Sequence, residues 1–106
     1  MGVDADIAVI DTGIAPHADL NTVGGYWCGG NKSSGWDTDG TGHGTHTAGI
    51  AAARNNNIGV VGTAPGARLW SVRVPNQQGI WYMSAALCAV DWVAAFPKDA
   101  DGTSGI

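Results

Sequence analysis

Two residues in the first half of the chain, Asp11 and His43, have the chemistry of an acid–base pair. Asp11 directly follows an apolar run at residues 7–10, and His43 lies in a glycine-rich segment that leads into an alanine-rich run. An imidazole can take a proton from a hydroxyl nucleophile, and a buried carboxylate fixes the tautomer of that imidazole and stabilises its charged form. This pair could therefore supply two of the three roles in a Ser-His-Asp triad.

The glycines on either side of His43 suggest close approach of another backbone. Gly42 and Gly44 carry no side chain, which would leave room for a bound substrate backbone. A glycine-rich turn at a helix start can also hold a dinucleotide phosphate. The required Gly-x-Gly-x-x-Gly pattern is not completed here, because Thr45 and Thr47 occupy the needed positions. We therefore discount a nucleotide site.

A metal site is the second alternative for these histidines. His43 and His46 are three residues apart and could share a metal ion with Asp11 or His17. His46 is more simply interpreted as a residue that packs one side of the helix. We expect it not to be the catalytic histidine.

The elements that would position the pair alternate between strand and helix patterns. Strands are expected at residues 7–10, 23–27 and 68–74, and helices at residues 45–53 and 84–96. Residues 28–42 are rich in Gly, Ser, Asn and Asp, so we expect a surface loop in which Asp37 and Asp39 are simply solvated. This order predicts an α/β fold with a parallel sheet, in which ligands bind at the carboxyl ends of the strands.

Composition excludes several classes of function. The 106 residues amount to one domain or less, and five scattered basic residues with a net charge of −4 give no surface for nucleic acid. No stretch approaches the roughly 20 apolar residues of a membrane helix, and the acidic start of the chain does not resemble a signal peptide. Cys28 and Cys88 could form a disulfide or remain two buried thiols, and the sequence leaves both open.

The segments around the pair resemble those of the subtilisin-like serine proteases, or subtilases. Residues 9–14 (Val-Ile-Asp-Thr-Gly-Ile) resemble the family's catalytic Asp motif, and residues 42–49 (Gly-His-Gly-Thr-His-Thr-Ala-Gly) its catalytic His motif. The resemblance implies that Asp11 orients the imidazole and that His43 is the general base and acid. It further implies a three-layer subtilisin-like fold, of which residues 1–106 form the N-terminal portion. The resemblance also implies a secreted, extracellular endopeptidase that acts on polypeptides and has an N-terminal propeptide not in this chain.

The third member of the triad is expected outside this chain. In the family the order is Asp, His and then Ser, with the Ser far downstream. Residues 102–104 (Gly-Thr-Ser) imitate the nucleophile motif, but Gly105 and Ile106 follow in place of the expected Met-Ala. We interpret Ser104 as a turn residue and expect the 106 residues to be inactive alone. The alternative is a non-catalytic, truncated protease domain that at most binds peptide.

By the same resemblance, the region after the third expected strand binds substrate. Gly79, Ile80 and Trp81 correspond to an exposed strand edge to which a peptide adds as a further strand. Met83 and Ala86 correspond to the pocket for the substrate side chain four residues before the cleaved bond. Both are apolar, which predicts a preference for a large hydrophobic residue there.

The resemblance also implies a structural calcium ion. Asp19 corresponds to the family's carboxylate ligand, and residues 54–60 to the loop that wraps the ion. This loop would offer the side chain of Asn56 and the backbone carbonyls of Arg54, Ile58 and Val60. All are oxygen ligands, which suit Ca²⁺. The alternative is a helix-ending turn at residues 55–57 and an ordinary surface carboxylate at Asp19.

Overall fold

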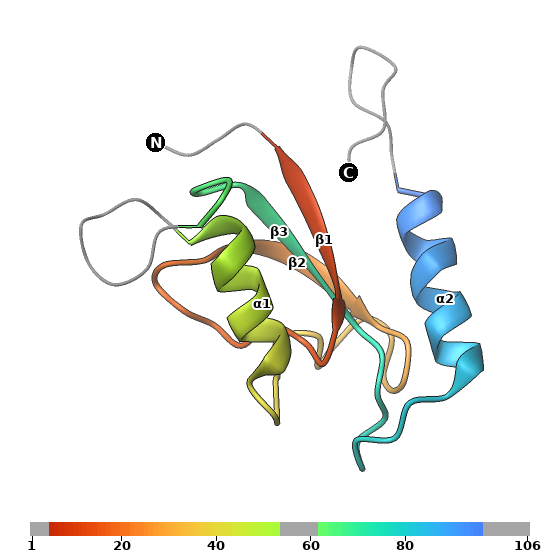
Figure 1. The fold of residues 1–106 in the computed structure, drawn as a ribbon. Helices are drawn as coiled ribbons and strands as arrows, with labels where there is room; N and C mark the ends of the chain where they lie inside the picture. Colours follow the sequence, from red (N-terminus) through yellow and green to blue (C-terminus); the bar gives the residue numbers. More distant parts are fainter. Residues whose placement is uncertain (1–4, 54–61, 97–106) are drawn as a thin grey trace.

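A computed structural model describes residues 5–53 and 62–96 of the chain. Along the described chain the elements are β1 (Asp6–Asp11), β2 (Asn21–Trp27), α1 (His43–Ala52), β3 (Arg68–Arg73) and α2 (Met83–Ala94) (Figure 1). The predicted order of strands and helices is confirmed. The bounds differ by one or two residues, chiefly because β2 begins at Asn21 and α1 begins at His43 itself.

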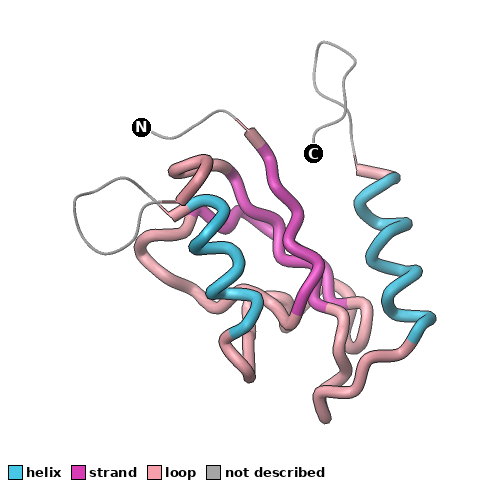
Figure 2. The backbone as a smooth tube through the Cα atoms, viewed as in Figure 1, coloured by secondary structure: helices cyan, strands magenta, loops and turns pink. Residues whose placement is uncertain are grey.

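The three strands, drawn in magenta in Figure 2, form one parallel sheet in the order β1-β3-β2, which confirms the predicted α/β class. In the central strand, Arg73 is opposite Asp11 of β1 on one side and opposite Trp27 of β2 on the other. The carboxyl ends of all three strands therefore meet at one edge of the sheet. That edge is where parallel α/β proteins bind their ligands.

The two helices cover opposite faces of the sheet (Figure 1). Because side chains alternate along a strand, Leu69 of β3 packs with the α1 side while Val72 packs with the α2 side. Each helix turns small alanines toward the sheet: Ala48 and Ala52 from α1, and Ala85 and Ala89 from α2. The result is a helix–sheet–helix arrangement of three layers. Neither of these helices is long and apolar enough to cross a membrane.

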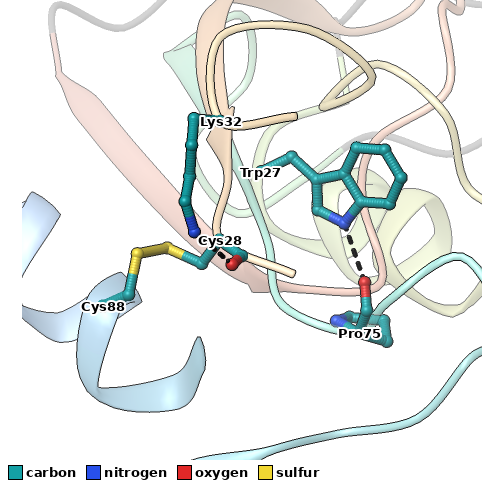
Figure 3. The surroundings of a disulfide bond; sticks show 5 residues. All are labelled: Trp27, Cys28, Lys32, Pro75 and Cys88. Carbon is teal, nitrogen blue, oxygen red and sulfur yellow. Dashed lines mark hydrogen bonds between the residues drawn. A yellow bond between two sulfur atoms is a disulfide. The ribbon is translucent and has the colours of Figure 1, made fainter. Parts of the chain in front are cut away.

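Cys28 and Cys88 form a disulfide, which answers the question that the sequence leaves open (Figure 3). The bond joins the end of β2 to the middle of α2 across a sequence separation of 60 residues. Beside it, Lys32 donates a hydrogen bond to the carbonyl of Cys28 at 2.7 Å, and the indole of Trp27 donates to the carbonyl of Pro75 at 2.7 Å. The disulfide thus anchors α2 to the edge of the sheet at which the strands end.

Candidate active site

Asp11 is the last residue of β1, and it is buried although it is charged. Only 8% of the surface of the whole residue is exposed to solvent. The backbone carbonyl accepts a hydrogen bond from Val74 N at 2.9 Å, and the carboxylate Oδ1 accepts one from Thr12 N at 2.7 Å. These bonds fix both the strand end and the carboxylate. A buried carboxylate of this kind needs a partner that can satisfy its charge.

That partner is His43, the first residue of α1. Its Nδ1 lies 2.8 Å from Oδ1 and 2.9 Å from Oδ2 of Asp11. An ionised carboxylate can only accept hydrogen bonds, so Nδ1 must carry the proton in this contact. Nε2 is then left as the acceptor of the neutral ring. The side chain of His43 is 70% exposed, whereas that of Asp11 is 12% exposed, so the imidazole is the accessible member of the pair.

The electrostatics of the site favour the charged imidazole. The hydrogen bond to Asp11 and the charge of Asp11 raise the pKa of His43. Desolvation of the ring opposes them, and the charge of Asp39 adds a lesser increase. A general base must be neutral to accept a proton. A base at this position therefore becomes competent as the pH rises through the pKa of His43.

Close packing of α1 on the loop after β1 brings the pair together. A Cβ at Gly44 would overlap the backbone carbonyl of Gly13, and Gly13 itself has a φ of 110°, which favours glycine. The expectation that Gly44 makes room for substrate is thus corrected, because its missing side chain admits the backbone of Gly13. Gly42 has a φ of 82° and open space around its Cα, so there the backbone conformation explains the glycine.

Comparison of the sequence with known protein families identifies the family of this chain. The model of the subtilase family matches residues 2–102. This chain belongs to the subtilase family.

Individual subtilases and a solved structure agree with this assignment. Subtilisin DY from Bacillus licheniformis is 42% identical over 92 residues, which are 86% of this chain and 33% of that protein. The minor extracellular protease Epr of Bacillus subtilis (strain 168) is 43% identical over 98 residues, which are 92% of this chain and 15% of that protein. The structure of MycP3 protease from the type VII (ESX-3) secretion system matches with a TM-score of 0.64 and 33% identity, covering 89% of this chain and 28% of that chain. The chain therefore spans about a third or less of the length of these relatives.

Asp39 is the functional candidate that the sequence interpretation missed. It was expected to be a solvated loop residue like Asp37, but its carboxylate accepts hydrogen bonds from Thr12, Gly42 and Thr45. Partial burial alone would raise the pKa of Asp39, yet hydrogen bonds from Thr45, Thr12 and Gly42 outweigh it and lower that pKa from 3.8 to about 2. These bonds stabilise the fold fully above pH 3.8, and their contribution disappears as the pH falls through about 2. An acidic residue shortly before a helix is a capping signal that could have revealed it.

His46 is also corrected. It was expected to pack one side of the helix, but in this structure it is exposed and lines a cavity of about 570 Å³ together with His17, Asp19 and Asp39. Within residues 5–53 and 62–96, no three side chains of the His, Cys, Asp or Glu type are arranged to hold a metal ion. His43 itself is engaged with Asp11, so nothing here supports the alternative of a metal shared by the histidines.

The predicted substrate-binding residues lie on an exposed segment that leads into α2. Gly79, with a φ of 84°, ends a turn that Asn76 closes by accepting from Gly79 N at 2.9 Å. Ile80 and Trp81 follow and are 49% and 52% exposed. Met83, the first residue of α2, is 75% exposed, and Ala86, which is partly buried, follows one turn later.

Of the predicted calcium ligands, the structure describes only Asp19, which is half-buried. Asp19 lines the same cavity as Ala53, the last described residue before residues 54–61. The other predicted ligands lie outside the described residues; they are Arg54, Asn56, Ile58 and Val60. Ser104 also lies outside the described residues.

Proposed function

We propose that this chain supplies the Asp and His of an Asp-His-Ser triad in a serine-type endopeptidase. The observation that carries the proposal is the contact of His43 Nδ1 with both oxygens of buried Asp11, at the carboxyl edge of a parallel sheet. Membership of the subtilase family supports it. The nucleophilic Ser is proposed to lie outside residues 1–106. Casein hydrolysis by the complete protein, with and without the substitution His43→Ala, tests the function.

The roles follow from the proton positions that the geometry allows. With Nδ1–H held by Asp11, Nε2 takes the proton of the serine hydroxyl as that oxygen attacks the peptide carbonyl. The imidazolium then gives this proton to the leaving amine. Asp11 stays ionised throughout, holding the tautomer and stabilising the positive charge on the ring.

Polypeptide is the proposed substrate, bound along the segment that precedes α2. Among the described residues, neither the backbone N–H nor the C=O of Trp81 makes a hydrogen bond, and the residue is half exposed. Free backbone groups on an extended, exposed segment can pair with an added peptide strand. This segment alone could bind peptide without cleaving it, which is why binding and turnover need separate measurements.

We expect the complete protein to prefer a large hydrophobic residue four positions before the cleaved bond. Met83 and Ala86 present apolar side chains one helical turn apart. In a pocket lined in this way, a substrate side chain that is larger or smaller by a few methylene groups changes kcat/KM by about tenfold or more. A peptide library varied at that position measures the preference. The substitution Met83→Lys should weaken it, while Ser84→Lys, at the neighbouring exposed position, should not. A library with no dependence at that position, or a preference for charge, would refute the assignment.

We further propose a structural calcium ion held by Asp19 and the predicted ligands at 54, 56, 58 and 60. The shared cavity supports this, because Asp19 and the residue that precedes Arg54 both line it. Carboxylate, amide and carbonyl oxygens are ligands that suit Ca²⁺.

Removing this ion should destabilise the complete protein. An ion present at about a thousand times its Kd stabilises the folded state by about 4 kcal/mol. Asp19→Ala and added chelator should therefore each lower the thermal midpoint by several degrees, whereas Asp37→Ala should not. If the midpoint is the same after Asp19→Ala and after chelation, there is no calcium site of this kind.

Secretion is proposed from two observations. The Cys28–Cys88 disulfide is typical of proteins that fold in an oxidising compartment. The similar protease Epr is described as extracellular.

A further inference from the structure

The carboxylate of Asp39 binds two segments of the chain that are distant in sequence. Its Oδ1 accepts from Thr12 Oγ1 at 2.7 Å and from Gly42 N at 2.9 Å. Its Oδ2 accepts from Thr45 N at 2.8 Å and from Thr45 Oγ1 at 2.7 Å. Both oxygens are therefore occupied, one by the loop after β1 and the residue before α1, and the other by the first turn of α1.

These contacts replace the usual cap of α1. The first N–H groups of a helix have no partner within it, and a side chain at the N-cap normally accepts from one of them. Here the N-cap is Gly42, which has no side chain. Thr12 Oγ1 accepts from Gly44 N at 2.9 Å, and Asp39 accepts from Thr45 N. The negative charge of Asp39 also lies at the positive end of the helix dipole.

The position of these partners links Asp39 to the Asp11–His43 pair. Thr12 directly follows Asp11, and Gly42 directly precedes His43. A residue that holds Thr12 and Gly42 at a fixed separation also holds the backbones of Asp11 and His43. The structure shows no hydrogen bond between Asp39 and either member of the pair within the described residues.

We propose that Asp39 is a positioning residue, which clamps the start of α1 to the loop after β1 so that His43 Nδ1 stays directed at Asp11. The proposal rests on the function proposed above. Two carboxylates raise the pKa of His43: Asp11 at the end of β1, and Asp39 in the loop before α1. The charge of Asp39 also acts on the pKa of Arg73 of β3, where it opposes the lowering by burial. Asp39 thus influences the imidazole through the backbone and through space.

Asp39→Asn in the complete protein tests the clamp. An amide has one oxygen, and its NH₂ cannot accept, so the hydrogen bonds to one side of the clamp are lost. We expect kcat to fall by about a hundredfold, since a small displacement of a catalytic group has that effect, with KM changed less than twofold. The pKa of His43, followed by NMR of its ring protons, should fall because a neighbouring negative charge is gone. Asp37→Asn removes an exposed carboxylate two residues away and is the matched control, with kcat, KM and pKa unchanged.

The possible results separate this inference from the proposed function. If His43→Ala leaves turnover intact, the proposed function fails. If His43→Ala abolishes turnover but Asp39→Asn behaves like Asp37→Asn, only the clamp is wrong. A lower thermal midpoint with an unchanged kcat and His43 pKa also overturns it, because Asp39 would then be merely structural. Should Asp39→Asn fail to fold, Thr12→Val and Thr12→Ser replace it. Thr12→Val loses the hydroxyl that binds Asp39, so its kcat must fall well below that of Thr12→Ser, which keeps the hydroxyl. Equal kcat values in the two variants contradict the proposal.

Discussion

Replacing His43 with alanine in the complete protein should lower kcat by about a million-fold. This magnitude is carried over from subtilisin, in which loss of the catalytic histidine has that effect. Asp11 contacts Nδ1 of the imidazole, so Nε2 is the ring nitrogen left to take the nucleophile's proton. Initial rates on a peptide substrate give kcat, and the thermal midpoint reports folding. His17→Ala removes an exposed histidine and is the control. Comparable losses in the two variants would contradict the assignment.

The companion substitution Asp11→Asn should cost about ten-thousand-fold in kcat. The amide NH₂ would face Nδ1, so the ring would place its proton on Nε2, where it blocks uptake of another. Because Asp11 is the main cause of the raised pKa of His43, that pKa should fall, and the acidic limb of the residual activity should move to lower pH. A pH–rate profile measures this, and a limb that moves to higher pH would be inconsistent with the proposed pair.

Residues 1–106 by themselves should neither hydrolyse casein nor react with a fluorophosphonate probe. They contain two of the three proposed triad residues, and loss of the nucleophile alone costs about a million-fold in rate in subtilisin. The one sequence that imitates the nucleophile motif is at Ser104, where Gly105 and Ile106 follow. Covalent labelling of Ser104 in these residues would overturn this expectation.

The arrangement of the elements was predictable because it depends on local patterns. Apolar runs such as residues 7–10 indicate buried strands, and the alternation of strands with alanine-rich helices indicates a parallel sheet with helices on its faces. Asp11 and His43 were predictable because each lies in a short segment of specific sequence. The structure places their side chains in contact, and their catalytic roles stay predictions.

What could not be predicted depends on contacts between distant residues. The helix pattern placed the start of α1 two residues late, because His43 and Gly44 are poor helix formers. The first turn is held from outside the helix by Thr12, which accepts from Gly44 N, and by Asp39, which accepts from Thr45 N. The role of Asp39 was missed for the same reason. The pairing of Cys28 and Cys88 depends on how α2 lies against β2, across 60 residues, and no local signal reports it.

The most direct test of the central claim, that Asp11 and His43 activate a serine nucleophile, is fluorophosphonate labelling of the complete protein followed by mass-spectrometric mapping of the adduct. We expect one labelled serine, outside residues 1–106, and a labelling rate that falls to background in His43→Ala but stays unchanged in His17→Ala. An adduct on Ser104, or labelling that is as fast without the His43 imidazole as with it, would show that the pair does not activate a serine in this way.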